Sequence, residues 1–86
     1  MNTLNNTLSK AFYKNGFVVI TLLSGVEIKF PIKGNKRLED ASEEDLMNIG
    51  ISPLGLHWEA LDEDLSLEGI LSGDYGQSNK AVGSTS

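Results

Sequence analysis

The acidic cluster Asp62–Asp64, with Glu63 at its centre, has the residue types that bind cations. Neighbouring carboxylates hold hard divalent ions such as Ca²⁺ or Mg²⁺ through their oxygens. A calcium loop, however, alternates its oxygen ligands around a glycine turn and ends on a distant glutamate, and that spacing is absent. We therefore expect Asp62 and Asp64 to shape the turn into a following helix by accepting backbone N–H hydrogen bonds.

His57 is the only histidine in the sequence, so one chain cannot form a two-histidine metal site. A catalytic base also needs a nucleophile or water beside it and a third group that holds it. Strand alternation sends His57 to the face opposite Trp58, and the adjacent Glu59 does not complete such an arrangement. We expect a half-exposed strand histidine, and Trp58 in the core on one face with Leu54 and Leu56.

Other catalytic motifs are missing. The sequence has no cysteine, which excludes disulfides, thiolate catalysis and cysteine-held metals. The basic cluster Asn35–Arg37 lacks the glycine spacing of a phosphate-binding loop, and no nucleophile elbow or dinucleotide fingerprint occurs. We expect no cofactor and favour a protein that is not an enzyme. The alternative is a small-ligand or divalent-metal-binding domain that uses His57, Glu59, Asp62 and Asp64.

Length and composition are typical of one small globular domain, with 86 residues, 40% hydrophobic and 22% charged. We expect a compact domain over residues 1–75, with residues 1–7 frayed, and a disordered tail over residues 76–86. The longest apolar run, Phe17–Ile20, is far shorter than the roughly 20 residues that span a bilayer. The first ten residues lack a signal-peptide pattern, which predicts a cytoplasmic protein without membrane contact.

Charge is distributed unevenly along the chain. Residues 1–38 contain six lysines and arginines and one acid, whereas residues 39–74 contain eleven acids and no lysine or arginine. With a formal net charge of −5, the chain is not expected to bind nucleic acid directly. Two interpretations remain open: the halves neutralise each other across the fold, or an acidic face receives a basic partner.

The pattern of turns and apolar residues predicts an α+β fold. Tight turns at Asn15-Gly16 and Ser24-Gly25 predict a three-strand antiparallel meander, over Leu8–Tyr13, Phe17–Leu23 and Val26–Ile32. The first segment also fits a helical stripe. The second is apolar on both faces, which predicts a central strand covered on each side.

The second half of the chain completes the predicted fold with two short helices and a fourth strand. One helix starts at Glu43 after a Ser42 cap, and the other covers Leu67–Leu71 after a Ser66 cap. The fourth strand runs through Trp58. The expected product is a small antiparallel sheet packed with two short helices. Three aromatic residues lie beside the first turn: Phe12, Tyr13 and Phe17. The sequence does not decide whether they form an exposed patch or pack across the hairpin.

The block Gly55–Trp58, followed by Leu61–Ser66 and Gly69–Leu71, resembles the small bacterial proteins grouped as domain of unknown function 2442. Upstream segments Ser24–Ile28 and Ala41–Leu46 fit the same pattern. Glu59 departs from it, because family members usually have proline there. The resemblance implies a compact α+β domain with no established activity. Some members carry a helix-turn-helix domain after it, which implies a sensing or partner-binding role in regulation.

Taken together, these observations predict a cytoplasmic protein–protein interaction or regulatory module, such as one partner of a regulatory or toxin–antitoxin-like pair. The expected contact elements are the exposed sheet edge and the acidic region, in which the candidate residues are His57, Trp58, Glu59, Asp62, Glu63 and Asp64. The expected partner is another protein of basic character. The same sheet edge could also pair two copies of the chain as a homodimer.

Overall fold

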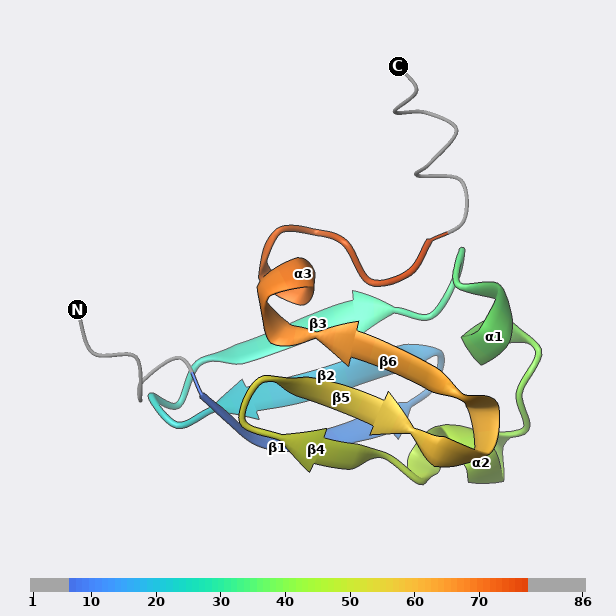
Figure 1. Cartoon of the computed structure of the whole chain (residues 1–86), viewed down its shortest axis with the longest axis horizontal. Helices are drawn as coiled ribbons and strands as arrows, with labels where there is room; N and C mark the ends of the chain where they lie inside the picture. Colours follow the sequence, from blue (N-terminus) through green and yellow to red (C-terminus); the bar gives the residue numbers. More distant parts are fainter. Residues whose placement is uncertain (1–6, 78–86) are drawn as a thin grey trace, which may run out of the picture.

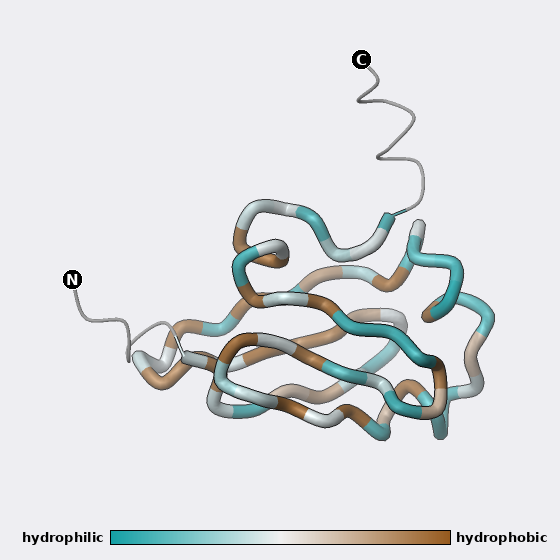
Figure 2. Tube along the Cα trace, viewed as in Figure 1, coloured by the Kyte–Doolittle hydropathy of each residue, from teal (hydrophilic) through white to brown (hydrophobic). Residues whose placement is uncertain are grey.

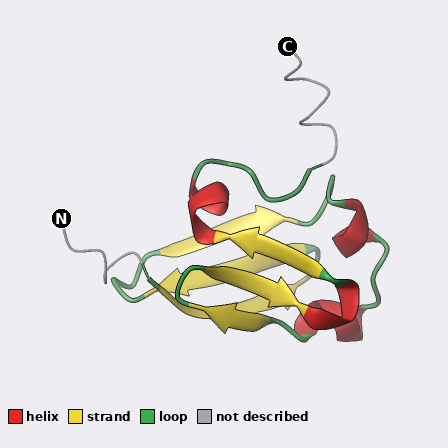
Figure 3. Cartoon of the chain, in the orientation of Figure 1, coloured by secondary structure: helices red, strands yellow, loops and turns green. Residues whose placement is uncertain are grey.

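Two three-stranded antiparallel sheets face each other in the computed structural model of the chain, which describes residues 7–77. The first sheet has the order β1–β2–β3, with bounds Leu8–Lys14, Phe17–Leu22 and Glu27–Pro31. The second has the order β4–β5–β6, with bounds Gly50–Ser52, Gly55–Trp58 and Glu63–Ser66. The helices are α1 at Lys36–Glu39, α2 at Glu43–Met47, the 3₁₀ helix η2 at Glu59–Leu61, and α3 at Leu67–Leu71. Figure 1 shows the second sheet in front of the first, and Figure 3 shows how short the helices are beside the strands.

The first sheet is the predicted meander, and β1 is a strand rather than a helix. Asn15 and Gly16 both adopt positive φ, 51° and 89°, as a tight hairpin turn requires. β2 is central in the sheet and buries Val18 and Ile20 completely on its inner face. Its outer face is only partly covered, so the prediction of cover on both sides is wrong. Figure 2 shows that hydrophobic positions recur along the strands.

The aromatic residues beside this turn divide between the two faces. Tyr13 packs against the core, and its hydroxyl accepts a hydrogen bond from the Gly16 N–H at 2.9 Å. Phe12 and Phe17 lie on the other face, with 46% and 36% of their surface exposed. Both interpretations of the sequence therefore apply, one to each face of the hairpin.

The α+β class is confirmed, but the fourth predicted strand belongs to a separate second sheet. That strand is β5, which pairs on either side with β4 and β6, two strands that the sequence did not indicate. Both are only three or four residues long and lack a β-branched pattern. Leu54 was expected to share a face with Leu56, but it lies in the β4–β5 turn and is 78% exposed.

Side-chain caps start each of the three α-helices. The predicted caps are confirmed, since Ser42 Oγ accepts from the Asp45 N–H at 3.2 Å and Ser66 Oγ from the Gly69 N–H at 2.9 Å. The basic cluster Asn35–Arg37 begins α1, a helix that the sequence did not indicate. Its cap is Asn35, whose Oδ1 accepts from the Leu38 N–H at 3.2 Å.

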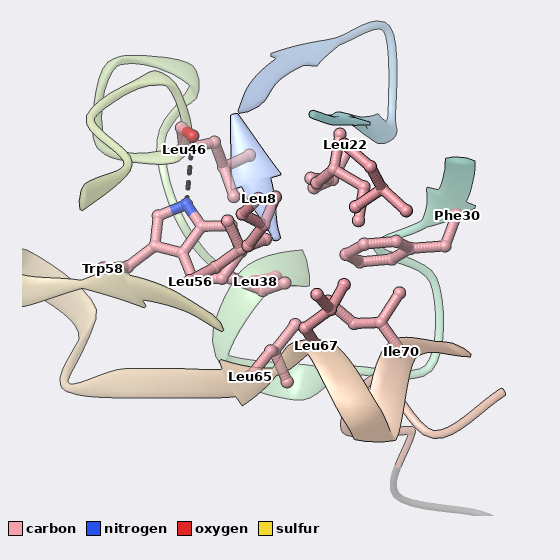
Figure 4. Packing of buried hydrophobic residues seen from close by; sticks show 12 residues of the cluster. Leu8, Leu22, Phe30, Leu38, Leu46, Leu56, Trp58, Leu65, Leu67 and Ile70 are labelled. Atoms are coloured by element: carbon pink, nitrogen blue, oxygen red, sulfur yellow. Dashed lines mark hydrogen bonds between the residues drawn. The ribbon is translucent and has the colours of Figure 1, made fainter. Parts of the chain in front are cut away.

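The core fills the space between the two sheets, with Trp58 completely buried at its centre. Figure 4 shows the Trp58 indole N–H donating to the carbonyl oxygen of Leu46, at 3.0 Å. A helix as short as α2 leaves its last carbonyls without partners, and the indole supplies one. The other buried hydrophobic residues are Leu8, Val18, Ile20, Leu22, Phe30, Leu38, Leu46, Leu56, Leu65, Leu67 and Ile70.

Asn35 links the two halves of the chain, and only 2% of it is exposed. Its amide nitrogen donates to Glu63 Oε2 on β6 at 2.9 Å and to the Tyr75 carbonyl oxygen at 3.0 Å. Gly76, with φ +84°, passes so close that an added Cβ would overlap this amide. The Asn35 side chain thus caps α1 and fixes both β6 and the segment after α3.

The expected frayed start and disordered tail lie outside the described residues, apart from Thr7, Gly76 and Gln77. Gln77 accepts a hydrogen bond from the Tyr75 N–H at 2.9 Å and donates to the Gly73 carbonyl at 3.0 Å. Within residues 7–77, the helices are all too short or too polar to cross a membrane.

Replacing Trp58→Phe removes the indole donor and leaves both a cavity and an unpaired Leu46 carbonyl. We expect the free energy of unfolding to fall by about 2–4 kcal/mol. The control Phe12→Leu, on the exposed face, should change it by about 0.5 kcal/mol or less. Urea unfolding followed by circular dichroism measures both, and equal losses would contradict the central position of Trp58.

Asn35→Asp keeps an oxygen that can cap α1 but replaces the amide donor with an oxygen facing Glu63 and the Tyr75 carbonyl. We expect a loss of about 2–4 kcal/mol in the free energy of unfolding. The control is Asn48→Asp at an exposed position after α2, which should cost less than about 1 kcal/mol. If Asn35→Asp were equally mild in urea unfolding, capping alone would explain Asn35.

Candidate functional site

The alternation of β5 and β6 divides the candidate residues between two faces. His57 lies opposite Asp64 in the register of the two strands, and Trp58 lies opposite Glu63. His57 Nδ1 and Asp64 Oδ1 form a close side-chain hydrogen bond on the outer face, where 49% and 75% of these side chains are exposed. Trp58, in contrast, is completely buried and offers no surface to a partner.

Glu63 has a structural role within the fold. Besides the Asn35 hydrogen bond, its Oε1 lies 3.6 Å from Arg37 Nε, and only 16% of its side chain is exposed. Arg37 also donates through Nη1 to the carbonyl oxygens of Leu61 and Asp62, both at 3.3 Å. Asp62 adopts φ +53°, the left-handed conformation that reverses the chain between η2 and β6. These contacts hold the turn that brings Asp64 beside His57.

Asp62 and Asp64 were expected to shape the turn into the Ser66-capped helix. Asp62 does lie in a turn, but a strand, β6, separates that turn from the helix. Glu59 is exposed in the first position of η2, where its backbone N–H needs no helical partner. Proline, which the resemblance implies at this position, would fit there for the same reason.

A shallow recess surrounds the His57–Asp64 pair on the outer face of the second sheet. Its polar side is formed by this pair, and Leu54 in the β4–β5 turn, 78% exposed, is its exposed apolar residue. Ile51 also lines it, but the register of Ile51 with Leu56 directs the Ile51 side chain to the opposite face of the sheet from His57. Gly50 and Gly55 leave the floor without side chains. A Cβ on Gly55 would lie 2.6 Å from the Leu65 carbonyl oxygen, so the sheet cannot accept a side chain there. We call this feature the acidic recess; Ser52, Leu56, Leu65 and Ser66 complete its lining.

The acidic recess lies on a strongly negative part of the molecule. Residues 50–74 contain six carboxylates and no lysine or arginine. Arg37 partly neutralises this region through Glu63, so the basic and acidic halves do touch. The carboxylates of Glu59 and Asp64 remain exposed at the surface.

The chemistry available to the His57–Asp64 pair is that of an oriented imidazole. Asp64 holds Nδ1, as carboxylates do in catalytic pairs, but a nucleophile must also be presented. Ser66, two residues beyond Asp64 on β6, uses its hydroxyl to cap α3. Within residues 7–77, no three His, Asp or Glu side chains gather closely enough to hold a metal ion. The pair is an exposed polar contact on the outer face of the second sheet.

Comparisons with known proteins agree with this fold. A protein of unknown function from Rhodospirillum rubrum has a similar crystal structure, with a TM-score of 0.74, 38% identity, and coverage of 81% of this chain and 89% of that chain. The solution structure of an uncharacterised protein from Chromobacterium violaceum has a TM-score of 0.72 and 35% identity, and covers 85% of this chain and 71% of that chain. No curated protein matches the sequence.

The family resemblance that the sequence indicates is confirmed. The model of the family described as "Protein of unknown function (DUF2442)" matches residues 8–76, which includes all six strands and the three α-helices. The chain therefore belongs to the DUF2442 family of proteins of unknown function.

Proposed function

We propose that this protein is a cytoplasmic interaction or regulatory module that binds a basic segment of another protein in the acidic recess. The observation that carries the proposal is the exposed Leu54 in the same recess as the Asp64 carboxylate. Apolar residues bordered by charge are typical of interfaces, in which the apolar part contributes affinity and the charge contributes specificity. A partner of a regulatory or toxin–antitoxin-like pair would use such a surface.

A basic partner follows from the charge around the acidic recess. Because residues 50–74 carry no lysine or arginine, an acidic segment would be repelled, whereas Lys or Arg side chains could pair with Asp64 and Glu59. The partner's apolar side chains would cover Leu54. Backbone pairing at the edges of this sheet contributes less, because β4 and β6 have only three and four residues.

The alternative function, binding of a small ligand or a divalent metal, would use the same recess. A metal ion or small ligand would need further binding groups in addition to His57 and Asp64, which are the two side chains that the fold brings into contact. The protein-binding proposal is favoured because the exposed Leu54 suits a partner with apolar side chains.

A twelve-residue peptide of alternating lysine and leucine is a suitable probe for the acidic recess. We expect its addition to the ¹⁵N-labelled chain to shift the amide signals of β4, β5 and β6. Asp64→Lys should weaken binding about tenfold, because it replaces attraction with repulsion beside the apolar contact. The matched control Glu44→Lys makes the same charge change on α2 and should have a much smaller effect.

Three outcomes would contradict this proposal. They are no shift at millimolar peptide, shifts centred away from the second sheet, and equal weakening by Asp64→Lys and Glu44→Lys. Equal weakening by the two variants would show that the peptide is attracted by the overall negative charge and not by the acidic recess. Titration with Mg²⁺ and Ca²⁺ distinguishes the metal-binding alternative from the protein-binding proposal. Only metal binding predicts that the amide signals of His57 and Asp64 shift when the ion is added without peptide. Urea unfolding of each variant verifies that the fold is kept.

A further inference from the structure

The outer face of the first sheet is chemically opposite to the acidic recess. Cross-strand registers place Phe12, Val19 and Lys29 in one row, and Lys14, Phe17 and Pro31 in the next. A further row contains Lys10, Thr21 and Glu27. We call this surface the basic–aromatic face; it carries three lysines and one acid.

Apolar side chains form the middle of this face. Phe12 and Phe17 are 46% and 36% exposed, and Val19 between them is half-buried. Together with Lys14, Glu27 and Lys29 they line a second recess. Lys29 Nζ lies 4.6 Å from the centre of the Phe17 ring, which is a cation–π contact. The arrangement is an apolar centre with a charged rim, which is the usual anatomy of an interface.

We propose that the basic–aromatic face binds an acidic segment of a partner protein. An apolar side chain of that segment would cover Phe12 and Val19, and its Asp or Glu residues on either side would pair with Lys14 and Lys29. The proposal goes beyond the binding of a basic segment in the acidic recess. Since the two outer faces lie on opposite sides of the core, both can be occupied together, and the module can join two different proteins.

Charge distinguishes this occupant from a second copy of the chain. A two-fold symmetric contact brings the same patch of each copy together, so the lysines of one basic–aromatic face would meet those of the other and repel. A head-to-tail contact with another copy's acidic recess avoids this repulsion. Because the two faces are on opposite sides, however, it would not close and would produce open chains of molecules.

Single-stranded nucleic acid is also less suitable than an acidic protein segment. Such ligands stack bases on free aromatic faces along a positive groove. Lys29 already covers the Phe17 ring, so this ring is not free for a base to stack on. An acidic protein segment needs only the local lysines and the apolar centre.

The test uses the full chain labelled with ¹⁵N and a twelve-residue peptide of alternating glutamate and leucine. We expect amide shifts on β1, β2 and β3, and weaker binding at high salt. The double variant Lys14→Glu with Lys29→Glu should weaken binding at least about tenfold. Phe12→Ser should also weaken it, whereas the control Lys33→Glu, in the connector after β3, should leave it nearly unchanged.

Several results would overturn the inference. These are no shifts on the first sheet at millimolar peptide, equal effects of Lys33→Glu and the double variant, or tighter binding of a twelve-residue thymidine oligonucleotide. Shifts on this face when the unliganded chain is diluted would identify a second copy as the occupant. Asp64→Lys should not reduce binding of the glutamate–leucine peptide. The two binding proposals can therefore fail independently.

Discussion

The single core between the two sheets is the constraint on which the rest of the structure depends. Strand side chains alternate, so each residue that enters the core sends its neighbour outward. Burial of Leu56 and Trp58 directs His57 to the surface, and burial of Val18 and Ile20 does the same to Phe17 and Val19. Within residues 7–77 the helices lie beside the sheets, so they leave these outer faces partly exposed.

The uneven charge of the sequence becomes a difference between two surfaces through this topology. The basic first half forms the first sheet, and the acidic second half forms the second. Within residues 7–77, the ion pairs between the lysines or arginines of the first half and the carboxylates of the second are Arg37–Glu63 and Lys36–Asp40, so neutralisation is local. The two interpretations of the charge pattern are therefore compatible: a few groups pair within the fold, and the others remain available to partners.

The sequence was sufficient where local chemistry decides the structure. Asn15-Gly16 predicted the first hairpin and Ser42 and Ser66 predicted the helix caps, because positive φ and capping depend on a few adjacent residues. It was insufficient for β4 and β6, which are short and become strands by pairing with β5. The proximity of His57 and Asp64 could not be predicted either, because it depends on the left-handed turn at Asp62 and the register that follows. The cluster Asp62–Asp64 indicated a turn, but the sequence contained no signal for the strand that follows it.

The central claim is that both outer faces are free to bind other proteins. Light scattering of the purified chain over a range of concentrations, at low and at high salt, tests it most directly. The account predicts the mass of one chain under all conditions. A stable dimer at both salt concentrations would contradict it, because one apolar face or sheet edge would then already be covered by a second copy.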